Sequence, residues 1–136
     1  MRKKCYALFL SLLCSLPSVA QPLLVGVTGN GGSSYGTVFT MPVGGTSITQ
    51  QFNLNSTVTV PGKNPQFNKL TQADNGKLYG FTQGGADGGI LFEYDPVTAI
   101  YTKKVEFNRQ IGNGPTGYLV KASNGKLYGL TSSGGP

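Results

Sequence analysis

Two carboxylates, Glu93 and Asp95, stand two residues apart in an apolar stretch, and they are the first candidates for chemistry. In a strand they would project from the same face, because strand side chains alternate between faces. Glycoside hydrolysis requires a pair of carboxylates about 5–9.5 Å apart, one of them with a raised pKa. The surroundings favour a structural interpretation, since Asp95 precedes Pro96 in a turn sequence whose backbone N–H groups a carboxylate can cap. We therefore expect no catalytic residue in this pair.

A second candidate is the glycine-rich segment 84–89, which contains Asp87. Calcium takes about 6–8 oxygen ligands, several of them from carboxylates, and one aspartate cannot supply them. The chain has no His, which removes Ser-His-Asp and Cys-His catalysis and most transition-metal sites. We therefore expect this segment to be a turn-rich connection between strands, and we expect neither a metal nor another cofactor.

The first twenty residues have the pattern of a secretory signal peptide. Residues 2–4 are basic, residues 6–16 form an apolar run of 11 residues, and residues 18–20 (SVA) place small residues before Gln21. The run is shorter than the roughly 20 apolar residues that span a bilayer. We expect export through a cleaved signal peptide to the exterior or the cell surface, with no membrane span after cleavage. The alternative is an N-terminal membrane anchor.

Removal of this leader changes the charge and the cysteine content. The whole chain has 11 Lys or Arg against 5 Asp or Glu. Residues 21–136 keep 8 basic residues against 5 acids, a net charge of +3, and neither of the 2 cysteines. The remaining lysines are scattered, whereas a nucleic-acid footprint needs them clustered on one face. We therefore expect no nucleic-acid partner and no disulfide in the mature chain.

An internal repeat supplies the elements that position these side chains. Residues 70–82 (LTQADNGKLYGFT) and 119–131 (LVKASNGKLYGLT) match at an offset of 49, and a Gly-Gly pair follows each copy. A third copy, without the NGK turn, begins with the LVGVT segment at 24–28. Self-similarity at a period of about 50 residues is typical of propellers and other repeat proteins.

Turn chemistry delimits short strands within one repeat. Asn75-Gly76, repeated as Asn124-Gly125, predicts a hairpin turn of type I′, which needs two residues at positive φ. No sustained helical period occurs outside the leader. We expect four strands, at residues 68–73, 77–82, 90–94 and 100–107.

A four-stranded unit exposes two faces, and stacked neighbours cover both. We therefore expect an all-β fold of propeller-like blades, each of four antiparallel strands. A β-sandwich has similar strand spacing but does not require one hairpin to recur at a fixed offset. The repeats would cover about 21–62, 63–112 and 113–136, about two and a half blades where closed propellers have about 4–8. We expect a fragment with open strand edges, through which copies can self-associate.

These residues also carry a resemblance to known repeats. The Gly-Gly pair at 84–85, the segment Tyr94 to Thr98 and the aromatic Tyr101 resemble the kelch repeat. The NGKLYG hairpin, the Gly-Gly loop and the GTVF strand at 36–39 are more closely similar to a glycine-rich tandem repeat of secreted bacterial proteins, the Gloeo/Verruco (GloVer) repeat. The resemblance covers nearly all of residues 22–136. It implies an extracellular β-propeller-like array and no catalytic residues.

The repeat and the resemblance together indicate a set of structural positions. They are Asn75, Gly76, Gly80, Gly84, Gly85, Asp95, Pro96, Tyr101, Asn124, Gly125, Gly129, Gly134 and Gly135. We expect the repeated aromatic side chains, Tyr79, Tyr94 and Tyr128 among them, to pack between blades. Lys77 and Lys126 are expected to cover a solvated edge.

The function expected from these features is that of an extracytoplasmic, non-catalytic binding or scaffold module. Its contact surface would lie at one end of the array, at the Gly-Gly connections or at the NGK turns. The partner would be a protein or a glycan at the cell surface. The alternative is a fragment of a secreted carbohydrate-active enzyme whose catalytic residues lie in blades that this chain does not contain.

Overall fold

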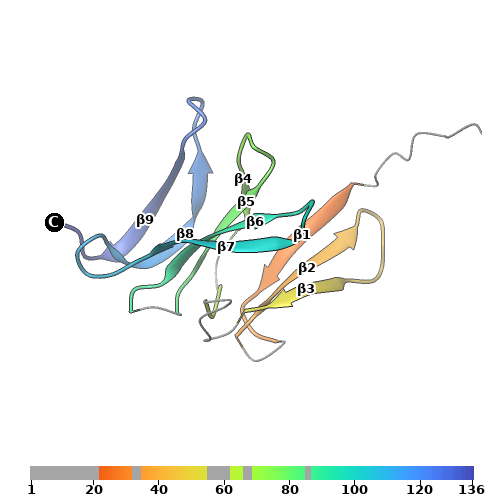
Figure 1. Ribbon diagram of the computed structural model, residues 1–136, viewed down its shortest axis with the longest axis horizontal. Helices are drawn as coiled ribbons and strands as arrows, with labels where there is room; N and C mark the ends of the chain where they lie inside the picture. Colours follow the sequence, from red (N-terminus) through yellow and green to blue (C-terminus); the bar gives the residue numbers. More distant parts are fainter. Residues whose placement is uncertain (1–21, 32–34, 55–61, 66–68, 85–86) are drawn as a thin grey trace, which may run out of the picture.

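The computed structural model describes residues 22–31, 35–54, 62–65, 69–84 and 87–136. Within these ranges the protein is all-β, with antiparallel strands in three sheets that follow one another along the chain (Figure 1). The predicted signal peptide and Gly85 lie outside the described residues. In the described part, nothing has the length and apolarity of a membrane-crossing helix.

Within each sheet, every strand pairs with its neighbours in the sequence. The first sheet contains β1 (Leu23–Thr28), β2 (Thr37–Pro42) and β3 (Thr49–Asn53). The second contains β4 (Thr71–Gln72), β5 (Leu78–Thr82), β6 (Ile90–Asp95) and β7 (Ile100–Glu106). The third contains β8 (Asn113–Lys121) and β9 (Leu127–Ser133). The three sheets do not close into a ring.

The sequence repeat is also a repeat of local geometry. In the first sheet the ring of Phe39 lies on Gly26, where an added Cβ would come within 2.5 Å of the ring. In the second sheet the ring of Phe92 lies on Gly80, where the same distance is 2.8 Å. The strand register shifts directly before the phenylalanine in both sheets. Strands β1–β3 therefore correspond to β5–β7, and the first sheet has no counterpart of β4 among the described residues.

The NGK hairpins do not have the predicted type I′ turn. Gly76 has a φ of 77°, but Asn75 is not at positive φ. The Gly76 N–H donates to the Ala73 carbonyl at 3.0 Å, and the Ala73 N–H donates to the Lys77 carbonyl at 3.0 Å, which defines a three-residue loop ending in a left-handed glycine. The cause is the Asn75 side chain, whose Oδ1 accepts the Lys77 N–H at 3.1 Å and holds Asn75 in a local turn. The hairpin at 124–125 has the same bonds.

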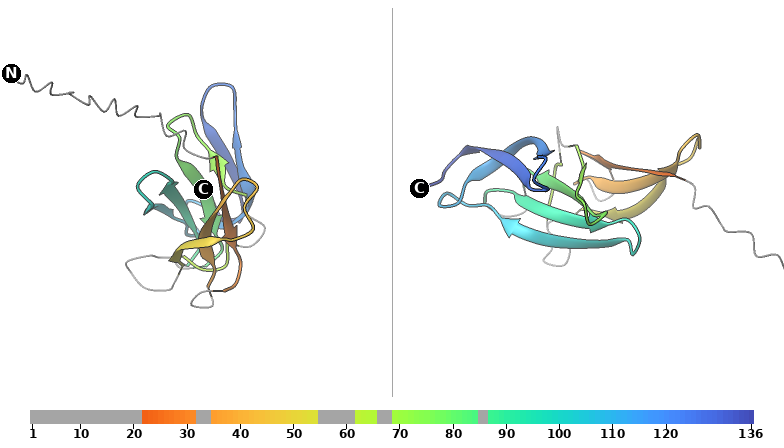
Figure 2. Two further views of the ribbon diagram at one scale, coloured as in Figure 1. Left: turned by 90° about the vertical axis from the view of Figure 1, so that its right-hand side faces the viewer. Right: turned by 90° about the horizontal axis from the view of Figure 1, so that it is seen from above.

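The main core lies between the first two sheets, which pack face to face (Figure 2). Its buried side chains are Val38, Ile90, Phe92 and Tyr94. Tyr101 stacks on Phe92 with ring centroids 5.1 Å apart and meets the Phe52 ring edge-on at 5.1 Å. Burial raises the pKa of the Tyr101 phenol. The predicted packing of aromatic side chains between sheets is confirmed here.

The second and third sheets make a second interface. The Phe81 ring lies over Gly129, 2.7 Å from where a Cβ would stand, and the Thr71 hydroxyl donates to the Leu119 carbonyl at 2.6 Å. An apolar cavity of about 230 Å³ remains between these sheets. The prediction of interior packing is wrong for Tyr128, whose exposed fraction is 53%, because it points away from the second sheet.

Because the strands run alternately up and down, successive connections lie at opposite ends of the array. The β4–β5, β6–β7 and β8–β9 turns leave one end, which we call the turn end. The β5–β6 loop and the β7–β8 connection leave the other, which we call the glycine-loop end (Figure 1). Side chains distant in sequence therefore meet at each end.

Candidate functional site

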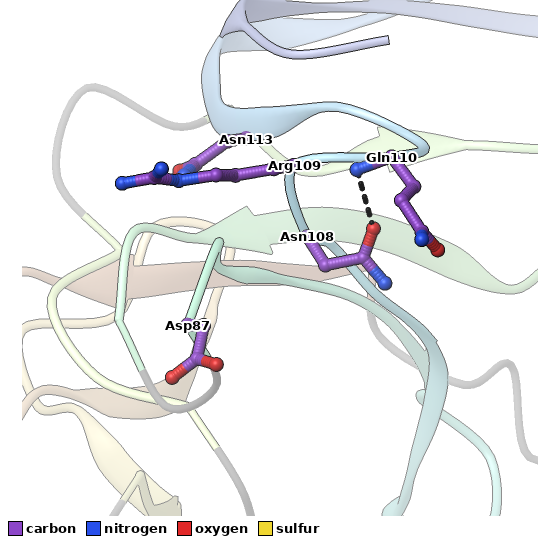
Figure 3. A pocket seen from close by; sticks show the side chains of 5 residues that line it. All are labelled: Asp87, Asn108, Arg109, Gln110 and Asn113. Atoms are coloured by element: carbon purple, nitrogen blue, oxygen red, sulfur yellow. Dashed lines mark hydrogen bonds between the residues drawn. The ribbon is translucent and has the colours of Figure 1, made fainter. Parts of the chain in front are cut away.

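A polar hollow of about 500 Å³ opens at the glycine-loop end. Five polar side chains line it: Asp87, Asn108, Arg109, Gln110 and Asn113. Asp87 comes from the β5–β6 loop, and the other four come from the β7–β8 connection and the start of β8. Arg109 and Asn113 lie on one side of the opening, with Asp87 across from them (Figure 3).

The β7–β8 connection is held by its own asparagine. The Asn108 Oδ1 accepts the backbone N–H groups of Gln110 at 2.9 Å and Ile111 at 3.1 Å. The Asn108 carbonyl accepts the Gly112 N–H at 2.9 Å. These bonds close a tight turn in which the Asn108 Nδ2 group takes no part, and they fix the start of the Arg109 and Gln110 side chains.

Close backbone contacts hold the two sides of the hollow together. The Gly88 carbonyl accepts the Gly114 N–H at 2.9 Å, and a Cβ at Gly88 would stand 2.5 Å from the Phe107 carbonyl oxygen. On the other side, the Arg109 carbonyl accepts the Gly135 N–H at 3.1 Å. The loop that carries Asp87 is therefore tied directly to the connection that carries Arg109.

The two charged groups of the hollow have no ionic partner within the described part of the chain. The ion pairs found there join Lys77 and Lys104 to Glu93, Lys103 to Glu106, and Lys121 to Asp74. The Arg109 guanidinium offers five N–H donors in a fixed plane, and the Asp87 carboxylate only accepts. Both remain available to a ligand with hydroxyl groups.

Glu93, one of the two candidate catalytic carboxylates, is engaged in a different way. Its side chain lies on β6 beside β5 and β7 and is buried. Lys77 donates to it at 2.7 Å, the Tyr79 hydroxyl donates at 2.7 Å, and Lys104 lies 3.5 Å away. The hydrogen bond from Lys77, followed by that from Tyr79, lowers the pKa of Glu93 to about 2. A carboxylate held ionised in this way is no general acid.

The sequence predicted only that Lys77 covers a solvated edge. The Lys77 ammonium also donates to the Glu93 carboxylate, and this hydrogen bond raises the pKa of Lys77. The first sheet carries a neutral version of the same network. There the Gln51 amide donates to the Thr40 hydroxyl at 2.7 Å, at the strand positions that Lys104 and Glu93 occupy in the second sheet.

Asp95 lies at the turn end and accepts the N–H groups of Val97 at 2.9 Å and Thr98 at 3.3 Å. These backbone bonds, the one from Val97 first, lower the pKa of the Asp95 carboxyl. Asp95 is thus occupied in its own turn. The described structure does not combine Glu93 and Asp95 into a two-carboxylate site.

The structural positions named from the sequence fall into three groups. Asn75, Gly76, Asp95, Pro96, Asn124 and Gly125 lie at the turn end, Gly80, Tyr101 and Gly129 lie within strands, and Gly84, Gly134 and Gly135 lie at the glycine-loop end. Gly84 exchanges two backbone hydrogen bonds with Lys63, at 2.9 and 3.0 Å. None of the described members lines the hollow, although Gly135 supports Arg109.

Sequence reasoning missed four of the five lining residues and took Asp87 for part of a connection. A usable signal was present: the polar run 108–110 (NRQ) follows the last strand of the repeat, and Asp87 follows its second strand. In an up-and-down sheet these two connections leave the same end. Within the described residues, no group of three or more Cys, Asp or Glu is placed to hold a metal ion.

Comparison of the chain with protein-family models, with curated proteins and with solved structures gave no match. The resemblance to kelch and GloVer repeats therefore stays a prediction from the residues that carry it.

Proposed function

We propose that this protein is a non-catalytic, extracytoplasmic binding module that holds a glycan in the polar hollow at its glycine-loop end. The observation that carries the proposal is the set of lining groups: one carboxylate, one guanidinium and three carboxamides, with both charges unpaired in the described structure. Sugar hydroxyls both donate and accept hydrogen bonds, and these side chains supply the matching acceptors and donors. The volume of about 500 Å³ suits a small number of sugar units.

In this proposal the three sheets are blades of a propeller-type array. Support comes from the recurring hairpin, from the aromatic ring seated on a glycine in each sheet interface, and from face-to-face packing in chain order. The leader pattern and the resemblance to secreted repeat proteins support export. Binding rather than hydrolysis is favoured because Asp87 is the one carboxylate among the described lining residues, whereas glycoside hydrolysis uses two.

The test is a binding measurement on the exported chain, whose N-terminus is first read by mass spectrometry and is expected at Gln21. The chain is screened on an array of bacterial and plant oligosaccharides, and the best-bound oligosaccharide is then titrated calorimetrically. We expect Arg109→Ala to weaken binding about 10- to 100-fold, because a hydrogen bond to a charged group contributes about 1.5–3 kcal/mol. Asp87→Asn, which keeps the shape of the side chain, is expected to weaken binding less.

Lys103→Ala serves as the control, because it removes a basic residue whose partner is the exposed Glu106 and which does not line the hollow. It should bind like the wild type. The proposal is contradicted if the array retains no oligosaccharide, or if Arg109→Ala binds the oligosaccharide as tightly as the wild type. Release of cleaved sugar during the titration would also contradict it.

A further inference from the structure

The far face of the β8–β9 hairpin is apolar and open. Its side chains are Tyr118, Val120, Tyr128 and Leu130, with exposed fractions of 52, 55, 53 and 75%. The opposite face of the hairpin is turned toward the second sheet, where buried Leu119 and the Cβ position of Gly129 lie beside the Phe81 ring. The Lys69 ammonium lies 5.7 Å from the Tyr118 ring centroid at the border of the patch. We call these four residues the tail face.

The repeat shows what normally covers such a face. Tyr128 and Leu130 stand 49 residues after Tyr79 and Phe81. Of the earlier pair, Phe81 packs against Gly129 of the third sheet. In the first sheet the corresponding residues, Val25 and Val27, pack against the core of the second sheet. In both earlier sheets this face is thus covered by the next sheet along the chain.

The opposite end of the stack presents the complementary surface. The outward residues of the first sheet are Leu24, Phe39 and Met41, which we call the head face. They correspond to Leu78, Phe92 and Tyr94, which the second sheet uses to pack on the first. Leu24 is 46% exposed, and no other described sheet covers the head face.

We propose that a second copy of this chain docks its head face on the tail face, so that the copies stack head to tail and continue the order of the sheets. The chain itself indicates the occupant, because the same two kinds of surface already meet at the interface between the first and second sheets and again between the second and third. A contact between two different patches leaves each pair with one free head and one free tail. Association is therefore expected to grow with concentration.

This contact differs from pairing between open strand edges, because it uses side chains on sheet faces rather than backbone hydrogen bonds. The β8–β9 hairpin offers two strands, where the first and second sheets offer three and four. The smaller area predicts association that is reversible on dilution.

The test is sedimentation velocity of the exported chain, with its N-terminus expected at Gln21, over a wide range of concentrations. Leu130→Lys blocks the tail face and Leu24→Lys blocks the head face. Each variant alone is expected to stay monomeric, while an equimolar mixture should form a dimer and stop there, since one intact head and one intact tail remain. Val97→Lys alters an apolar residue that is 90% exposed at the β6–β7 turn and should associate like the wild type.

Circular dichroism checks that each variant keeps its strands, and Val120→Lys and Met41→Lys replace any variant that does not. A wild-type chain that stays monomeric at every concentration overturns the proposal. The same holds if the tail face binds an oligosaccharide and the chain stays monomeric. Variants that associate like the wild type would assign the contact to strand edges. A mixture of the two blocked variants that remains monomeric would also overturn it.

Discussion

The buried carboxylate of Glu93 should make the stability of this protein depend on pH in a specific window. Its folded-state pKa of about 2 lies below the ordinary value of 4.5. A lowered pKa in the folded state means that the carboxylate stabilises the fold fully above pH 4.5. That contribution is lost as the pH falls toward 2. The substitution Glu93→Gln keeps the size of the side chain and removes this titration.

The magnitude follows from the shift and its surroundings. A difference of about 2.5 pKa units corresponds to at most about 3.4 kcal/mol. The Lys77 side chain is 36% exposed, so solvent screens the pair, and we expect about 1–2 kcal/mol at pH 7. The Glu93→Gln variant should therefore be less stable than the wild type by that amount at pH 7. The difference should shrink between pH 4.5 and 2.

The assay is urea unfolding followed by circular dichroism at a series of pH values, with all proteins at one concentration because self-association would shift the midpoints. The control is Glu106→Gln, which removes a carboxylate that is 50% exposed and paired with Lys103. We expect the control to change stability by less than about 0.5 kcal/mol. A difference between wild type and Glu93→Gln that is independent of pH, or equal to that of the control, would refute the reasoning.

Two further substitutions test the packing of the Phe92 ring on Gly80 and the positive φ of Ala99. Gly80→Ala should destabilise the protein by about 1–3 kcal/mol, because its Cβ would stand 2.8 Å from both the Leu70 side chain and the Phe92 ring; unchanged stability in thermal unfolding would show that the ring moves aside freely. Ala99→Gly should stabilise it by up to about 1 kcal/mol, because Ala99 has a φ of 57° and a left-handed conformation costs an ordinary residue about 1–2 kcal/mol. A lower urea midpoint for Ala99→Gly would count against that assignment.

The strands were predictable because their boundaries are local. The strands expected at 77–82, 90–94 and 100–107 occur at 78–82, 90–95 and 100–106, since glycines, or Asp-Pro, flank β-branched and aromatic runs. The turn type was not predictable from Asn75-Gly76 alone. That dipeptide fits both a two-residue and a three-residue hairpin, and the side-chain bond of Asn75 to Lys77 selects between them.

The candidate site was largely hidden because it depends on contacts between distant segments. The bond from Lys77 to Glu93 requires the register that sets Tyr79 opposite Glu93 on β5 and β6, which no local pattern specifies. The hollow requires the β5–β6 loop to meet the β7–β8 connection. Only the order of the strands, together with the bond from Gly114 to Gly88, brings Asp87 near Arg109.

The division of the array into two ends has a consequence for how such a protein can be altered. At the turn end, two hairpins share the sequence NGKLYG, and an exposed ion pair of Lys121 with Asp74 links their neighbouring turns. At the glycine-loop end the connections differ in sequence from copy to copy. Loops grafted there would change what the protein recognises while the sheets keep their register. The scaffold thus separates the residues that evolution or an engineer can vary from those that must be copied.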